Sequence, residues 1–206
     1  MINIVSKFID EKSLCKSDNK LLVAISGGAD SVALFLCLKE LGYDVELAHC
    51  NFNLRGDESD NDEEFVKKLA DKFGVRLHLK SFDTQKYADE NKVSIQMTAR
   101  DLRYKWFNEL LVDNNLNYIA VGHHKNDDVE TFFINLTRGS GLKGLLGIKT
   151  KNNNIIRPLL CVSRLEIEAY LSAVKQSFRE DSSNKAVKYL RNKIRYELIP
   201  LLTEMN

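Results

Sequence analysis

The chain has 206 residues and a mass of 23.6 kDa, enough for one domain with a sizeable core or for one domain with a small appendage. Hydrophobic residues make up 44% and charged residues 29%, as in ordinary soluble globular proteins, and the net charge of +1 indicates no particular partner. The four cysteines form no CxxC pair and no long uncharged apolar run occurs, which disfavours zinc ribbons, disulfide frameworks, signal peptides and membrane spans and favours a cytoplasmic location.

Charge is distributed unevenly along the chain. Residues 55–64 carry six acids against one arginine, whereas from Lys149 onward eleven Lys and Arg residues face six Asp and Glu residues. The basic part could face a polyanion such as a nucleic acid. A solvated helix face explains the same charges, and composition alone favours it.

Short apolar runs rich in Val, Ile and Leu predict strands that are buried on both faces, at residues 21–25, 45–49, 75–79 and 118–122. Segments with helical periodicity lie between and after them, at residues 31–41, 58–73, 95–112 and 126–138. Because strands and helices alternate, we predict an α/β fold with a doubly wound, mainly parallel sheet.

The C-terminal part begins with four glycines in residues 139–147, which predict a loop with unusual backbone angles or a close approach to another group. After this loop we expect a short extended piece at residues 155–160 and a helix capped by Ser163. A last helix is expected from about residue 187 to residue 198, with Pro200 near its end.

The turn after the first strand indicates a phosphate site. Gly27 and Gly28 let backbone N–H groups point into a concavity, and the following helix adds its positive N-terminal end. Ser26 and Ser31 add hydroxyl groups, and Asp30 fits beside an anion mainly if Mg²⁺ accompanies the phosphates. The patterns GxxxxGK[ST] and GxGxxG are absent. Taken alone, this turn is also compatible with a purely structural role.

The stretch SGGADS, residues 26–31, resembles the SGGxDS signature of the PP-loop ATP pyrophosphatases, which cleave ATP between its α and β phosphates. The resemblance implies that the loop holds the departing pyrophosphate. The ATP-binding residues that it implies are Ser26, Gly27, Gly28, Ala29, Asp30 and Ser31.

Further stretches are similar to the tRNA(Ile)-lysidine synthetase family in order and spacing, so that the resemblance covers residues 21–202. These stretches are HCNFNLRGDESDNDEEFV, ARDLRY, GHHKNDDVETFFINLTRGSGLKGL, IIRPLL, FREDSSN and YLRNKIRYELIPLL. The resemblance implies a two-step ligase. ATP adenylates the wobble cytidine of an isoleucine tRNA with a CAU anticodon, and the side-chain amine of free lysine then displaces AMP to give lysidine.

The sequence departs from the family pattern at three places. Phe52 stands where a histidine is usual, and Gln96 replaces a frequent glutamate. Where DDQ is common after the paired histidines, this chain has Asn126, Asp127 and Asp128. These changes leave the ATP loop intact but put the roles around Gln96 and Asp128 in doubt.

Asp127 and Glu130 lie three residues apart on a predicted helix, so both carboxylates share one face. Lysine arrives as an ammonium ion, and these acids can bind it, accept its proton or hold Mg²⁺. We assign catalysis to Asp30, Asp127 and Glu130, and metal binding to Asp30 and Asp127. The alternative is that Asp127 and Glu130 have no catalytic role and only stabilise the N-terminal end of the helix through its dipole.

By family resemblance, His49 and Asn51 line the adenosine pocket, although a buried structural histidine is the alternative for His49. Arg103 is assigned to catalysis, with a solvated helix face as its alternative. Contacts to tRNA phosphates would explain the other arginines. Those that we assign to tRNA are Arg55, Arg100, Arg138, Arg191 and Arg195.

We expect residues 1–150 to form the ATP-binding catalytic part and residues 151–206 a basic helical extension of the same domain. The expected partners are the tRNA and free L-lysine, without a membrane, and the assembly state is open, a homodimer included. The chain stops soon after Pro200, so we expect weaker tRNA binding than in any longer form. The rival functions are another PP-loop tRNA-modifying enzyme, such as a thiolase, and a nucleotide-dependent RNA-binding module without turnover.

Overall fold

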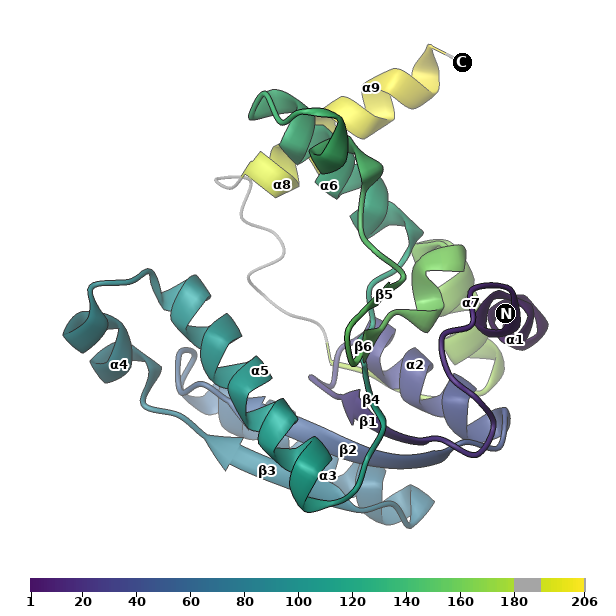
Figure 1. Cartoon of the computed structure of the whole chain (residues 1–206), viewed down its shortest axis with the longest axis vertical. Coiled ribbons are helices and arrows are strands. Elements are labelled where there is room, and N and C mark those ends of the chain that lie inside the picture. The colour runs from purple at the N-terminus through teal and green to yellow at the C-terminus, as the bar shows by residue number, and fades with distance from the viewer. Residues whose placement is uncertain (180–189, 206) are drawn as a thin grey trace.

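The computed structural model describes residues 1–179 and 190–205, and its described strands form one six-stranded sheet in the order β3-β2-β1-β4-β6-β5 (Figure 1). All neighbouring strands are parallel except β5 and β6, which form an antiparallel pair. The strands are β1 (Lys20–Ala24), β2 (Asp44–Asn51), β3 (Leu77–Ser81), β4 (Tyr118–Ala120), β5 (Lys151–Asn152) and β6 (Ile155–Ile156). The predicted α/β fold with a mainly parallel sheet is confirmed.

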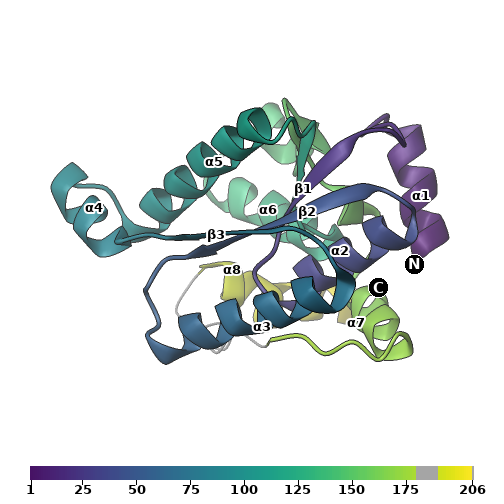
Figure 2. The same cartoon turned by 90° about the horizontal axis from the view of Figure 1, so that it is seen from below.

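Helices cover both faces of the sheet, as Figure 2 shows, with α5 on one side and α2, α3 and α7 on the other. Each side has its own apolar core, one built around Phe35 and Leu47 and the other around Phe107 and Ile119. The helices of these layers are α1 (Ile2–Glu11), α2 (Ala29–Glu40), α3 (Asp57–Phe73), α4 (Thr84–Asn91), α5 (Ile95–Asp113) and α7 (Arg164–Ala173).

The strand order places a switch point between β1 and β4. From β1 the chain first builds outward through β2 and β3 and then returns to the other side of β1 with β4. At such a point the loops after neighbouring strands diverge and leave a crevice at the carboxyl ends of the strands. The loop after β1 and the loop after β4 flank this crevice.

Two expectations about strands need correction. The third strand was expected to be buried on both faces, but β3 lies at the edge of the sheet and three of its five residues are exposed. In residues 155–160 only Ile155 and Ile156 are extended, because Pro158 begins a short 3-10 turn that ends at Cys161. The expected cap of α7 is confirmed, since the Ser163 hydroxyl accepts from the backbone N–H of Glu166.

A second group of helices stands away from the sheet in Figure 1. It consists of α6 (Lys125–Thr137), α8 (Leu190–Lys193), a π-helical turn (Ile194–Leu198) and α9 (Ile199–Glu204). The last helix therefore continues past Pro200, contrary to expectation, because the proline occupies the first turn of α9, where its missing N–H is tolerated. The expected start of this helix at residue 187 lies outside the described residues.

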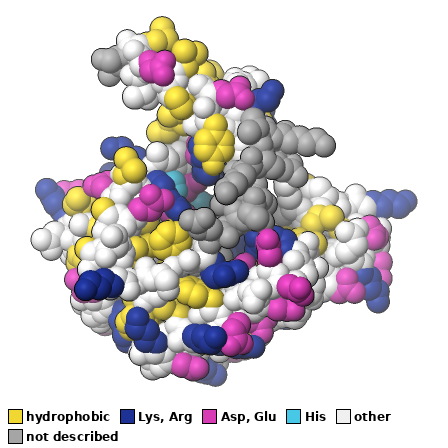
Figure 3. All heavy atoms as spheres, turned by 180° about the vertical axis from the view of Figure 1, so that it is seen from behind, with side chains coloured by type: hydrophobic (Ala, Val, Ile, Leu, Met, Phe, Trp, Pro, Cys, Tyr) yellow, Lys and Arg dark blue, Asp and Glu magenta, His cyan; other side chains and the backbone are white. Residues whose placement is uncertain are grey.

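We call α6, α8, the π-helical turn and α9 the helical arm. The arm exposes apolar side chains, Leu201 and Met205 among them. Figure 3 shows hydrophobic side chains on the surface of the part that projects from the sheet. The 3-10 turn Leu142–Leu146 follows α6, and its two terminal leucines are more than 80% exposed. None of the described helices combines the length and the apolar character needed to cross a bilayer.

Candidate active site

The loop between β1 and α2 is built to present backbone amides. Gly27 has a φ of +92°, which side-chain-bearing residues rarely adopt, and Gly28 precedes α2 without any side chain that caps the helix. The Ser31 hydroxyl donates to the Gly28 carbonyl at 2.9 Å and lies 3.1 Å from the Ser26 hydroxyl. Two loop amides already have partners, since the Ser26 N–H donates to the Ser31 hydroxyl and the Gly28 N–H to the Ser26 hydroxyl. The first N–H groups of α2 have no intrahelical partner and no capping side chain.

The end of β4 presses against this loop. A Cβ atom at Gly122 would lie 3.0 Å from the carbonyl carbon and oxygen of Asp30 and 3.1 Å from the Ser31 nitrogen. Only glycine lets the two backbones approach so closely. Gly122 thus couples the position of the loop to the central sheet, and it brings His123 next to the loop.

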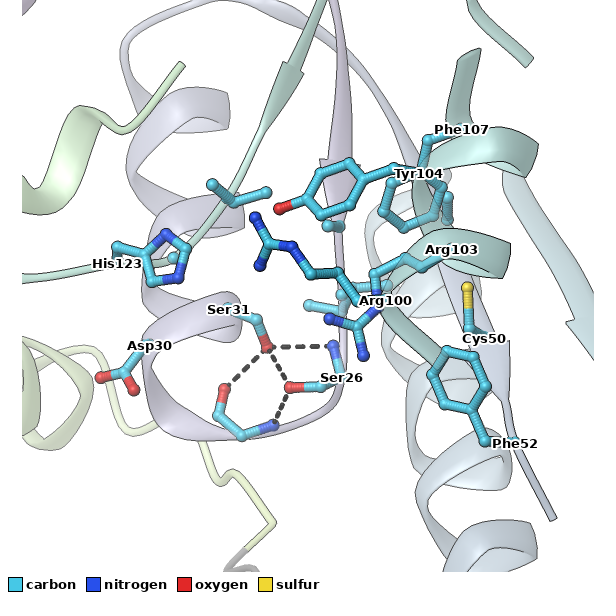
Figure 4. Close-up of a pocket in the computed structure, with 16 residues that line it drawn as sticks. Ser26, Asp30, Ser31, Cys50, Phe52, Arg100, Arg103, Tyr104, Phe107 and His123 are labelled. Atoms are coloured by element: carbon cyan, nitrogen blue, oxygen red, sulfur yellow. Dashed lines mark hydrogen bonds between the residues drawn. The ribbon is translucent and has the colours of Figure 1, made fainter. Parts of the chain in front are cut away.

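A cavity of about 260 Å³ opens beside the loop, and Figure 4 shows the side chains that surround it. The ends of β1, β2 and β4 form one wall and α5 forms the opposite wall. Its polar lining comprises Ser26, Asp30, Ser31, Cys50, Arg100, Arg103, Tyr104 and His123. Four of the six predicted loop residues and two of the predicted arginines therefore meet in one cavity, while Gly27 and Ala29 do not line it.

His49 and Asn51, which the resemblance assigns to the adenosine pocket, do not line this cavity. Side chains alternate along a strand, and at the end of β2 the residues that line the cavity are Ala48, Cys50 and Phe52. His49 is buried, and its Nδ1 lies 2.9 Å from the Ile25 carbonyl.

Asn51 points away from the cavity as well. Its side-chain amide donates to Asp60 and Glu63 in the first turns of α3, at 3.3 Å and 3.1 Å. Both residues therefore hold the end of β2 in place, and the structural alternative for His49 is the one that fits.

Aromatic rings support the arginines of α5. The Arg103 guanidinium carbon lies 5.1 Å from the centre of the Phe52 ring, and that of Arg100 lies 5.0 Å from the Tyr104 ring. Phe52 also stacks on Phe82. A guanidinium over an aromatic ring is held in place without a carboxylate partner. These contacts therefore keep the two guanidinium cations at the cavity.

The carboxylates of Asp30 and Asp127 flank the buried ring of His124. Its Nε2 atom lies 3.8 Å from Asp30 Oδ1 and 3.5 Å from Asp127 Oδ2. Arg164 donates to Asp30 at 2.8 Å. Burial raises the pKa of Asp30, the charges of His124 and Arg164 lower it, and the nearby charge of Asp127 raises it. Two acids from separate elements thus meet beside the loop.

Glu130 is fully buried, and Arg195 holds it. Arg195 Nε and Nη2 donate to its two carboxylate oxygens at 2.6 Å and 3.0 Å, and Arg191 lies 3.6 Å away. The helices α6 and α8 and the π-helical turn are joined through these contacts. Arg191 and Arg195, which we assigned to tRNA, thus both face a buried acid in this structure.

The remaining two arginines that were assigned to tRNA lie apart from the cavity. Arg55 donates to Asp62 at 2.9 Å on the acidic start of α3. Arg138 is exposed at the C-terminal end of α6.

Two residues near the site, Arg157 and Arg164, escaped prediction. Arg164 comes from the N-terminus of α7, and Arg157 comes from the segment after β6, so chain order gave no hint that they approach the loop. Arg179 donates its backbone N–H to Gly27 and its Nε to Asp62. Asp128 accepts from the backbone of Ile148 and thereby fastens the glycine loop to α6, a structural role.

The donor set suits a hard divalent cation that also contacts phosphate. Asp30 and Asp127 offer carboxylate oxygens, which Mg²⁺ prefers, and Mg²⁺ usually keeps several waters and substrate oxygens. Within residues 1–179 and 190–205, no three His, Cys, Asp or Glu side chains form a group that could hold a metal unaided. Phosphate oxygens and water would therefore have to complete such a site.

A family model described as the PP-loop domain matches residues 2–202. Several curated relatives carry the name tRNA(Ile)-lysidine synthase. The protein of Bacteroides thetaiotaomicron is 52% identical over 98% of this chain and 47% of its own length. The protein of Porphyromonas gingivalis is 49% identical, and the match covers 100% of this chain and 46% of the relative. The protein of Chlorobaculum tepidum is 41% identical, and the match covers 96% of this chain and 62% of the relative. The chain spans about half the length of the first two relatives.

Two solved structures are similar in fold. The U34-tRNA thiolase NcsA from Methanococcus maripaludis, with its [4Fe-4S] cluster, has a TM-score of 0.78 at 17% identity and covers 98% of this chain and 72% of its own. The NH3-dependent NAD synthetase from Campylobacter jejuni has a TM-score of 0.54 at 16% identity, and the match covers 98% of this chain and 90% of the synthetase chain. At these identities the similarity establishes the fold alone.

Proposed function

The chain belongs to the PP-loop domain family, and from this premise we propose that it is the catalytic part of a tRNA(Ile)-lysidine synthase. In this proposal, residues 1–150 bind ATP and carry the chemistry, and residues 151–206 form a basic helical extension of the same domain. The pairing of β6 with β4 supports a single domain. The four free thiols agree with a cytoplasmic location.

The observation that carries the proposal is the uncapped N-terminus of α2 beside the cavity. The amides of its first turn suit the β and γ phosphates of ATP, because an acceptor-only oxyanion complements N–H groups without an intrahelical partner and the helix dipole. Mg²⁺ would be held by Asp30 and Asp127, and when bound it would neutralise charge on the phosphates. The side chains of these two acids lie on either side of His124 Nε2.

The first step transfers the adenylyl group. The C2 oxygen of the wobble cytidine attacks the α-phosphorus, the bond to the bridging oxygen breaks, and pyrophosphate leaves. Arg100 and Arg103 line the cavity, and in this proposal they contact the reacting groups. A fixed guanidinium aimed at developing negative charge is an effective transition-state contact.

In the second step the side-chain amine of L-lysine attacks C2, and the C2–O bond breaks to release AMP. The amine must first lose a proton, because its pKa is about 10.4. In this proposal the carboxylate of Asp127 accepts the proton from the lysine amine. Glu130 supports the lysine site, and since Arg195 already pairs with its charge, its contribution is to hold Arg195 in place.

Contacts to the tRNA are proposed for Arg55, Arg100 and Arg138, while Arg191 and Arg195 contribute through Glu130. A homodimer is a further proposal, in which the exposed leucines Leu142 and Leu146 would supply an apolar contact. Size-exclusion chromatography with light scattering distinguishes a monomer from a dimer.

A thiolase-type reaction is less well supported. Burial raises the pKa of Cys50, the cysteine in the cavity lining, to about 12, so its thiol stays protonated at neutral pH. A protonated thiol is a poor nucleophile and a poor metal ligand.

The direct test is incubation of the protein with ATP, labelled lysine and an isoleucine tRNA transcript with a CAU anticodon. We expect lysine to be incorporated into this transcript, with one AMP released per lysine. A methionine tRNA transcript, which shares the anticodon, is the control and should stay unlabelled. Binding of ATP and tRNA without AMP release would leave only the binding-module alternative.

A further inference from the structure

Arg157 is a buried cation with an unusual set of partners. It is 6% exposed, its Nε donates to Nδ1 of His123 at 3.1 Å, and its Nη1 donates to the Lys149 carbonyl at 2.7 Å. In the described part of the chain, no carboxylate forms an ion pair with it. Burial lowers the pKa of the Arg157 guanidinium, because a buried cation loses the water that stabilises its charge. A buried arginine is costly, so its contact with an imidazole needs an explanation.

The contact fixes where the imidazole carries its proton. Every nitrogen of a guanidinium is a donor, so His123 Nδ1 must accept with its lone pair. A neutral ring then has its single N–H at Nε2. Burial, followed by the positive charges of Arg157, Arg191 and Arg100, lowers the pKa of His123 to about 4 against the opposing effect of Asp127. The ring is therefore neutral at physiological pH.

His123 is also placed to use this proton. It lines the cavity, directly after Gly122, whose backbone touches Asp30 and Ser31. Figure 4 shows the ring at the cavity wall, next to Asp30 and across from the side chains of α5. With Nδ1 occupied by Arg157, Nε2 is the nitrogen left for a molecule in the cavity.

We propose that Arg157 is a positioning residue that fixes His123 as a neutral Nε2–H donor, and that this donor recognises an oxygen of the α-phosphate of ATP. The inference rests on the proposed function. If the loop holds the β and γ phosphates, the α-phosphate lies next to it, where His123 is. A phosphate oxygen can only accept a hydrogen bond, so it fits the Nε2–H tautomer and is repelled by the other one, whose Nε2 carries a lone pair.

Nitrogen-15 NMR of the protein with labelled histidine tests the tautomer without any reaction. The wild-type spectrum should show His123 with a protonated Nε2 and an unprotonated Nδ1 at neutral pH, with the signal assigned from its loss in His123→Gln. In Arg157→Met, which removes the donor, Nδ1–H should become populated. A wild-type ring that is protonated on Nδ1, or charged, would overturn the inference whether or not the protein makes lysidine.

Two substitutions at His123 test the use of the donor. Gln places an amide N–H near the position of Nε2, whereas Asn places its amide near Nδ1. We expect His123→Gln to retain kcat for AMP formation within about tenfold and His123→Asn to lose about a hundredfold, with smaller changes in KM for ATP. Equal losses in the two variants would contradict recognition through Nε2. If the wild type forms no AMP, the proposed function fails while the NMR result still decides the tautomer.

Discussion

At the scale of single residues, the site depends on two acids that come from different elements. Asp30 lies in the first turn of α2 and Asp127 in the first turn of α6, and both approach His124 Nε2. Acids beside a phosphate site are unfavourable unless a cation accompanies the phosphates. Their presence next to the loop is therefore easier to reconcile with turnover of ATP than with simple binding.

We predict that Asp30→Ala and Asp127→Asn each reduce AMP formation at least about a hundredfold, because each removes a proposed oxygen ligand of Mg²⁺. Release of AMP from α-labelled ATP measures the effect, and circular dichroism should show an unchanged fold. Asp113→Asn, at an exposed position at the end of α5, is the matched control and should retain activity. Full activity of either variant would remove that residue from the mechanism.

His49 gives a prediction for stability. Burial lowers its pKa below the ordinary value of 6.5, while the Ile25 carbonyl and nearby acids oppose the shift. In the unfolded chain the ring takes up a proton as the pH falls through about 6.5. In the folded protein the lower pKa keeps the ring neutral to a lower pH. Because the unfolded state then binds more protons, the free energy of unfolding falls as the pH drops from 7.5 to 5.5.

His49→Asn can keep a donor near the Ile25 carbonyl but cannot titrate. Urea denaturation at the two pH values should therefore show a smaller loss of stability in the variant than in the wild type. His123 remains in both proteins, so part of the pH dependence persists. An identical loss in both proteins would show that His49 does not titrate differently on folding.

At the scale of elements, the contact between β4 and the loop decides whether the amides are correctly placed. Gly122→Ala adds a Cβ about 3 Å from the backbone of Asp30 and Ser31, and backbone cannot move aside as a side-chain tip can. We predict that this variant binds ATP at least about tenfold more weakly. Calorimetric titration measures the affinity. Gly141→Ala is the control, since nothing lies within 4 Å of its added Cβ, and wild-type affinity in both variants would refute the coupling.

Elements with strong periodicity could be predicted from the sequence, and those set by distant contacts could not. The strand runs near Leu21 and Val45 and the helix starting at Ile95 appear where expected, because their apolar residues face the two cores. The helices α1 and α4 were not predicted, although α1 buries Val5 and Ile9 on one face. The last helix passes Pro200 through a π-helical turn that no local signal announces.

The residues of the site also divide into those that local sequence could predict and those that it could not. The loop Ser26–Ser31 could be found because glycine and serine spacing acts locally, and Arg100 and Arg103 because they share one face of α5. His49 does not line the cavity, because the family resemblance gives the strand but not which of its faces meets the cavity. Arg157 and Arg164 follow β6 in the chain and reach the loop only through the sheet order, which is a property of the tertiary structure.

At the scale of the whole molecule, the two cores make the sheet a rigid platform with the loop at its switch point. A ligand that binds only the folded state stabilises it by about 2.7 kcal/mol at a hundred times its Kd. For a chain of this size we predict a rise in Tm of about 5–10 °C with saturating ATP and Mg²⁺. Because the amides are expected to hold the β and γ phosphates, pyrophosphate should also raise Tm, and more than AMP does. A larger effect of AMP would contradict this assignment.

The central claim is that the amides of Ser26–Ser31 hold the phosphates that leave from ATP. A crystal structure of the protein with Mg²⁺ and an ATP analogue that cannot be cleaved between the α and β phosphates tests it most directly. We predict that the β and γ phosphates accept hydrogen bonds from these amides and that the α-phosphate lies in the cavity lined by His123 and Arg100. An analogue bound elsewhere, with the loop filled by protein side chains, would contradict the account.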